Sequence, residues 1–148
     1  MKKFRLETIR KIKINKENKE SILLAKIISQ KDIILMELEQ KKQELNKIYK
    51  EKENLKKGFE HIIIQEYIDS IYTVIKKLQN DLINLEFEIE KQKKKLLDAV
   101  KERKKLDEYK KKWTENEKII EMKKENKEIE DIISNKLIHS FKRNNVFR

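Results

Sequence analysis

The chain has 148 residues, of which 44% are charged and 37% are hydrophobic, with one glycine, no proline and a formal charge of +11. Chain reversals need residues that tolerate a positive φ or that fix φ, so this chain cannot make the many turns of a sheet-rich fold. Lysine, glutamate, leucine and isoleucine are abundant and most of them favour helices, which predicts an all-α protein with few turns.

The composition also excludes several kinds of active site. There is no cysteine, so thiolate zinc sites, disulfides and thiol nucleophiles are excluded. Phosphate-binding loops need at least two glycines close together. The two histidines, His61 and His139, lie far apart and outside any H-E-x-x-H pattern. We therefore expect a non-enzymatic protein without a metal or cofactor.

The N-terminus, Met1 to Arg5, is basic, but its apolar residues are spaced and do not form a secretory signal. The longest apolar run, Ile33 to Met36, is far below the roughly 20 residues that a membrane span requires. We expect a cytoplasmic protein with no direct membrane insertion.

The first helix is predicted over about residues 4–57. Stepping forward from Ile27 by alternating four and three residues visits the a and d positions of a coiled coil. The ten positions are Ile27, Lys31, Ile34, Leu38, Lys41, Leu45, Ile48, Lys52, Leu55 and Phe59. Seven of them are apolar, and the other three are lysines.

A turn is predicted near residues 57–62, with about 58–61 outside both helices. Gly58 is the kind of residue that follows a helix C-terminus in a left-handed conformation, and Lys56 and Lys57 suit the C-terminal dipole. The alternative is one unbroken helix that tolerates a glycine at a cost of about 1 kcal/mol.

The second helix is predicted over about residues 62–141 and is the longer one. The eleven positions of its stripe are Ile64, Ile68, Ile71, Ile75, Leu78, Leu82, Leu85, Ile89, Gln92, Leu96 and Ala99. All of them except Gln92 are apolar. Further on the stripe thins to Leu106, Trp113 and Ile120. Another apolar face then begins, made of Ile129, Ile132, Ile133, Leu137 and Phe141. This overhanging face indicates a partner-binding helix or, alternatively, a frayed segment, and residues 142–148 form a basic tail.

The two stripes predict an antiparallel coiled-coil hairpin, a single rod-like domain over 1–148. Pairing residues whose numbers add up to 123 places Lys31 opposite Gln92, Glu20 opposite Arg103 and Phe59 opposite Ile64. A parallel homodimer of a bent helix is the structural alternative.

The charge is concentrated near the two termini. Residues 1–19 hold eight basic residues and two acidic ones, and residues 136–148 hold four basic residues and no acidic one. A hairpin brings both termini to one end, where such a field attracts an acidic partner. The basic residues are nearly all lysine, whereas specific nucleic-acid readers favour arginine and stacking aromatics. We therefore expect no nucleic-acid partner, and a basic nucleic-acid-binding hairpin is a minor alternative.

Several phrases in the sequence resemble the flagellar export protein family FliJ, in matching order and spacing along the whole chain. The opening Lys3-Phe4-Arg5-Leu6-Glu7-Thr8 resembles the start of that family. Glu66-Tyr67-Ile68-Asp69-Ser70-Ile71 resembles the phrase that opens its second helix. The segment Leu97–Lys112 resembles its basic stretch, and Lys124–Ile132 with Phe141-Lys142-Arg143 resembles its acidic-then-basic end.

The resemblance implies a cytoplasmic stalk of the flagellar type III export apparatus, peripheral to the inner membrane and similar in form to the central stalk of rotary ATPases. It implies three partners: the hexameric export ATPase, the cytoplasmic part of the export gate and export chaperones. The alternative is a structural scaffold or the stalk of another secretion or rotary machine.

The resemblance also assigns candidate binding residues. Gate contact falls on Tyr67 and Ile71, and more loosely on Leu45 and Tyr49, while Tyr72 departs from the polar residue common in the family. Ile71 also lies on the predicted seam, and Tyr67 does not. The candidates for binding the ATPase ring lie at the terminal end: Phe4, Arg5, Ile133, Leu137, Phe141, Lys142 and Arg143.

Overall fold

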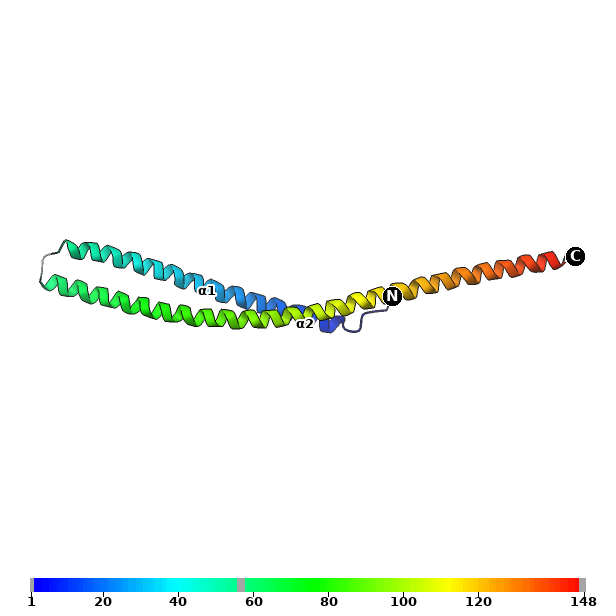
Figure 1. Ribbon diagram of the computed structural model, residues 1–148, viewed down its shortest axis with the longest axis horizontal. Coiled ribbons are helices and arrows are strands. Elements are labelled where there is room, and N and C mark those ends of the chain that lie inside the picture. Colours follow the sequence, from blue (N-terminus) through cyan, green and yellow to red (C-terminus); the bar gives the residue numbers. More distant parts are fainter. Residues whose placement is uncertain (1, 56–57, 147–148) are drawn as a thin grey trace. The chain divides into compact units, whose positions relative to one another are not determined.

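The computed structural model describes residues 2–55 and 58–146, the last three by their backbone alone. These residues form two helices, α1 (Glu7–Glu53) and α2 (Phe59–Val146), and no strand occurs within the described ranges (Figure 1). The prediction of an all-α fold with a longer second helix is confirmed. The chain divides into two compact units: the hairpin unit, Lys13–Lys101, and the terminal unit, Met1–Ile12 with Glu102–Arg148. A single domain over 1–148 stays a prediction.

In the hairpin unit, α1 and α2 lie side by side and antiparallel, with an apolar seam between them (Figure 1). The buried cluster is Leu38, Leu45, Ile48, Ile68, Ile71, Ile75 and Leu78, with Ile34, Ile64 and Leu82 packed against it. All of these residues belong to the two predicted stripes. Each buried Leu or Ile contributes roughly 1.5–3 kcal/mol to folding, so the seam holds the hairpin together. Phe59 was also predicted to lie in this seam, but its side chain is 76% exposed.

The turn starts earlier than expected. The last turn of α1 tightens, with Asn54 N donating to Glu51 O and Leu55 N donating to Lys52 O. Gly58 has φ +148°, a conformation that L side chains rarely adopt, and His61 N donates to its carbonyl at 3.0 Å. Gly58 therefore leads into α2 and does not directly follow the end of α1. The chain reverses here, which excludes one unbroken helix; residues 56 and 57 lie outside the described residues.

The predicted interhelical register is wrong by about one heptad. Lys31 Nζ lies 3.8 Å from Glu86 Oε1, and Lys52 Nζ lies 2.5 Å from Gln65 Oε1. The prediction had placed these lysines opposite Gln92 and Ile71, six residues further from the turn in each case. Glu20, expected opposite Arg103, instead accepts hydrogen bonds from Gln92. After a slip of seven residues, the a positions of one helix again face the d positions of the other. Periodicity alone therefore could not select the register.

In the terminal unit, the N-terminal residues pack on the part of α2 that begins at Glu102. Every described side chain from Lys118 to Arg143 is exposed. The helix runs to Val146, beyond the expected end at 141 and through most of the expected basic tail; residues 147 and 148 lie outside the described residues. Neither helix, over the residues described, has a stretch long and apolar enough to cross a membrane.

Candidate partner-binding surfaces

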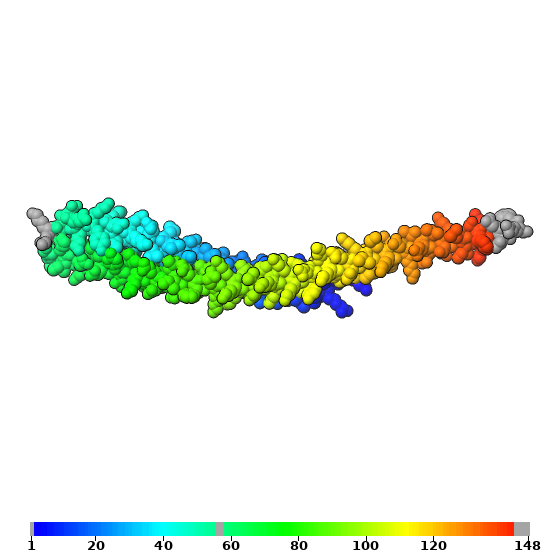
Figure 2. All heavy atoms as spheres, in the orientation of Figure 1, coloured from blue at the N-terminus to red at the C-terminus, as the bar shows by residue number. Residues whose placement is uncertain are grey.

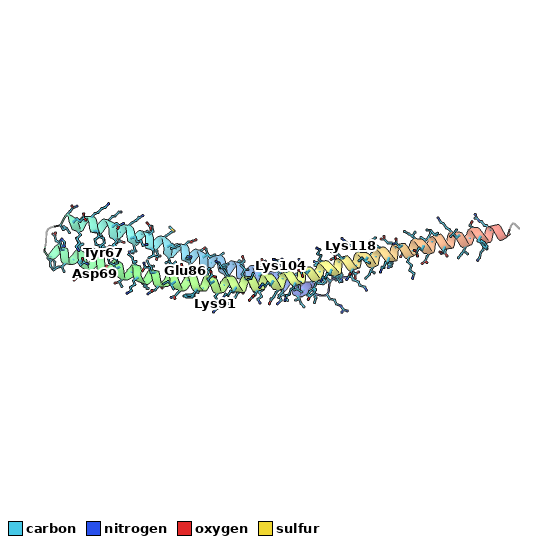
Figure 3. All side chains as sticks on the ribbon, viewed as in Figure 1. Tyr67, Asp69, Glu86, Lys91, Lys104 and Lys118 are labelled. Atoms are coloured by element: carbon cyan, nitrogen blue, oxygen red, sulfur yellow. The ribbon has the colours of Figure 1, made fainter. Side chains whose placement is uncertain are left out.

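Three tyrosines lie near the turn: Tyr49, Tyr67 and Tyr72. Tyr67 Oη donates a hydrogen bond to Glu44 Oε1, and the hydroxyls of Tyr49 and Tyr72 lie 2.9 Å apart. The bond to Glu44 raises the pKa of Tyr67 and lowers the pKa of Glu44, and the bond to Tyr72 raises the pKa of Tyr49. All three rings stay partly accessible, and Figure 3 labels Tyr67 close to the turn.

The two tyrosine bonds lie on opposite edges of the seam. Tyr67 directly precedes the core residue Ile68, whereas Tyr72 directly follows the core residue Ile71. Positions before and after a core residue flank opposite sides of a coiled coil. The two gate candidates Tyr67 and Tyr49 therefore lie on opposite edges of the seam.

The other two gate candidates are core residues. Leu45 is 8% exposed and Ile71 is 3% exposed, and both belong to the apolar cluster. A folded hairpin does not present these side chains to a partner. What they do is hold in place the helix faces that carry the tyrosines.

An open cleft beside the turn was not expected from the sequence. Its lining combines apolar and acidic side chains: Glu51, Asn54, Leu55, Glu60, Ile63 and Ile64. Ile63 lies off the heptad stripe and is 51% exposed. An apolar residue off the stripe was the feature of the sequence from which this cleft could have been predicted.

In the terminal unit, an ionic and aromatic clamp fastens the N-terminal residues to α2. The Phe4 and Trp113 rings have centroids 5.7 Å apart at a tilt of 48°, a geometry typical of attractive aromatic pairs. Arg10 Nε donates to Asp107 Oδ1 at 2.8 Å, and Lys110 Nζ lies 3.0 Å from Glu7 Oε2.

The clamp shifts the pKa values of its own members. The Lys110 ammonium lowers the pKa of Glu7, with a further contribution from Arg10. The Arg103 guanidinium, followed by that of Arg10, lowers the pKa of Asp107. Asp107 in turn raises the pKa of Arg10. Each shift favours the charged form, which is the form that these ion pairs need.

The last part of α2 carries the terminal stripe: Ile129, Ile132, Ile133, Leu137 and Phe141. These side chains are 52–68% exposed, and no other part of the terminal unit lies against this orange-to-red segment in Figure 2. Arg5, Lys142 and Arg143 are also exposed, while Phe4 is half-buried in the clamp. Of the predicted ring-binding residues, all but Phe4 are therefore freely accessible.

No group of three or more histidine, aspartate or glutamate side chains is arranged to hold a metal ion in the part of the chain that the structure describes. The candidate surfaces are apolar and aromatic faces of long helices. This arrangement suits protein–protein contact.

The fold and these surfaces define a class, the helical coiled-coil hairpins with exposed apolar helix faces. The family model of the flagellar FliJ protein matches residues 1–140, and the chain belongs to this family. The proteins of this family are structural components of the flagellar export apparatus. No curated protein and no solved structure matched the chain.

Proposed function

We propose that this protein is a non-enzymatic, cytoplasmic stalk of the flagellar export apparatus. Its terminal unit binds the export ATPase ring, the region near its turn binds the cytoplasmic part of the export gate, and it also binds export chaperones. The observation that carries the proposal is the terminal stripe, an exposed apolar face on a member of an export family. Unpaired apolar faces of this kind mark sites of protein contact.

Ring binding is assigned to the terminal unit for two reasons. Ile133, Leu137 and Phe141 form an apolar face with Lys142 and Arg143 directly after it, so the same segment offers burial and positive charge. Arg5 adds another exposed cation, while Phe4 acts through the clamp by packing its ring against that of Trp113.

Gate binding is assigned to the two edges of the hairpin near the turn. Tyr67 is the main candidate on one edge, and Tyr49 with Tyr72 forms the other. Tyrosines are enriched in interfaces because they combine a large apolar surface with a polar group at little conformational cost. Leu45 and Ile71 support the tyrosines from the core.

The first experiment mixes the full chain with the export ATPase of the same organism and measures ATP turnover and ring assembly. We expect saturable stimulation near one copy per hexamer. A variant lacking residues 130–148 should lose ring binding while its hairpin unit stays helical. Equal binding by the truncated chain would remove the terminal stripe from the ring interface, and no stimulation of a competent ATPase would refute the stalk function.

The gate assignment is tested with Tyr67→Ala and Tyr67→Phe. Truncating a central interface tyrosine costs about 2 kcal/mol, or roughly thirtyfold in Kd. Tyr67→Phe removes only the bond to Glu44 and should bind with a much smaller loss. Affinity for the purified gate domain is measured by calorimetry, with Ile132→Ala as a control from the other unit. Unchanged affinity of Tyr67→Ala would remove this residue from the interface.

A further inference from the structure

The terminal stripe has no cover within its own unit. Ile129 is 54% exposed, Ile133 is 52% exposed and Leu137 is 65% exposed. Most helical stability in proteins comes from packing an apolar face. A helical segment of this length with such a face is stabilised by another helix laid along it.

The charges around the stripe divide it into two opposite halves. Residues 125–131 hold four acidic residues and one lysine, whereas residues 132–143 hold three basic residues and no acidic one. Two copies in parallel would place like halves side by side, which is unfavourable. Two antiparallel copies that meet about Ile133 place residues 125–131 of one copy beside residues 135–141 of the other, where Lys136 is the charged residue. The antiparallel direction therefore sets this acidic stretch against a lysine and not against a second acidic stretch.

The hairpin unit shows the contact that such a pairing uses. Glu44 and Tyr67 each directly precede a core residue, Leu45 and Ile68, and they bond to each other across the antiparallel helices. Glu125 and Lys136 take corresponding positions, because Glu125 directly precedes Asn126, one heptad before Ile133, and Lys136 directly precedes Leu137.

We propose that the terminal stripe binds the same stripe of a second copy of this chain in an antiparallel pair with Ile133 at the two-fold axis. In this register Ile129 packs against Leu137 of the second copy, and Glu125 forms an ion pair with Lys136 of the second copy. A two-fold interface repeats every contact, so both contacts occur twice. The pair covers the face that the proposed function assigns to the ATPase ring, so self-association and ring binding exclude each other.

The first test measures the mass of the full chain by sedimentation equilibrium from about 1 to 500 μM, a range suited to a weak interface. We expect a reversible monomer–dimer equilibrium. Glu125→Lys and Lys136→Glu should each raise the dimer Kd about tenfold, because each turns two attractive contacts into repulsive ones. The double variant should restore the affinity. The control Lys124→Glu alters the charge on the opposite face of the helix and should leave the Kd unchanged.

The direction of pairing is tested with cysteines, since the chain has none of its own. Disulfides need Cα atoms about 4.4–6.8 Å apart. Mixing Ile129→Cys chains with Leu137→Cys chains should give a cross-linked pair with one chain of each kind. Links within each variant alone would show parallel pairing and overturn the proposal.

A chain that stays monomeric over the whole range, or a double charge variant that is not restored, also overturns the proposal. The proposed function is judged separately by the ATPase assay. A monomer that stimulates the ATPase refutes only the self-pairing, and a dimer that never stimulates it refutes only the stalk function.

Discussion

At the scale of single residues, Gln92 is a polar side chain inside an otherwise apolar stripe. It is 6% exposed, and its Nε2 donates to the Glu20 backbone carbonyl at 3.1 Å and to the Glu20 carboxylate. Buried polar groups are tolerated when they are bonded. Because only one level of the seam provides these acceptors, the contact favours one register over its neighbours.

Gln92→Glu should destabilise the hairpin unit by about 1–3 kcal/mol at neutral pH, because it sets a second carboxylate against Glu20 in a poorly solvated place. The loss should shrink as the pH approaches about 4, where carboxylates become protonated. Thermal unfolding followed by circular dichroism measures both effects. Gln79→Glu, on the exposed surface, is the control. Equal melting of the two variants would show that Gln92 does not contribute to the seam.

The clamp of the terminal unit should release in acid. The pKa values of Glu7 and Asp107 are lowered, so their stabilising contribution is present above the ordinary carboxyl pKa and is lost as the pH falls through the lowered values. Below about pH 4, Phe4 should leave Trp113, the single tryptophan, and its fluorescence should shift to the red.

Asp107→Asn is the matched variant for the clamp. It should show the red-shifted emission already at neutral pH and a weaker response to acid. Emission that is independent of pH in the unaltered chain would mean that these carboxylates do not hold Phe4 on α2.

At the scale of elements, the pairing of α1 with α2 depends on a narrow seam. Ile68 is fully buried at its centre, among residues from both helices. The positions where a substitution would destabilise the hairpin can be read from the stripes, because burial follows the heptad spacing. The register does not follow in the same way, because stripes that repeat every seven residues match again after each slip of seven.

Ile68→Ala should lower the free energy of unfolding by about 2–5 kcal/mol, since it removes buried methyl groups and leaves a cavity. Ile132→Ala, on the exposed terminal stripe, should change it by less than about 0.5 kcal/mol at low concentration, where the chain is monomeric. Urea unfolding followed by circular dichroism gives both values. A similar loss in the two variants would contradict the observed seam.

At the scale of the whole molecule, the two units differ in the interactions that stabilise them. The hairpin unit has an apolar core, whereas the terminal unit has a clamp near its start and then only exposed side chains from Lys118 to Arg143. The free energy of folding is therefore concentrated in the hairpin unit.

Removing residues 130–148 should reduce the total helical signal but leave the main melting midpoint within about 2 °C of the full chain, because no core contact is lost. Melting is compared at low concentration, where the chain is monomeric. A large fall in the midpoint would show that the terminal segment contributes to the folded hairpin.

The sequence by itself determined the helices, the two stripes, the presence of a turn at Gly58 and the exposed terminal face, because these follow from local propensity and from spacing along one chain. Tyr67 was also recognisable as lying off the seam. Each of these features depends on residues within a few turns of each other.

Only the tertiary structure decided the register, the edges on which the tyrosines lie and the clamp that joins Phe4 to Trp113. The bond between Tyr67 and Glu44, like that between Tyr49 and Tyr72, joins residues 23 apart. Such partners are set by where the chain reverses, and a repeating pattern allows several reversals that bury the same stripes. The physical reason is that periodicity fixes which face of a helix is buried, while the position along the partner helix depends on the turn and on single polar contacts such as Gln92 with Glu20.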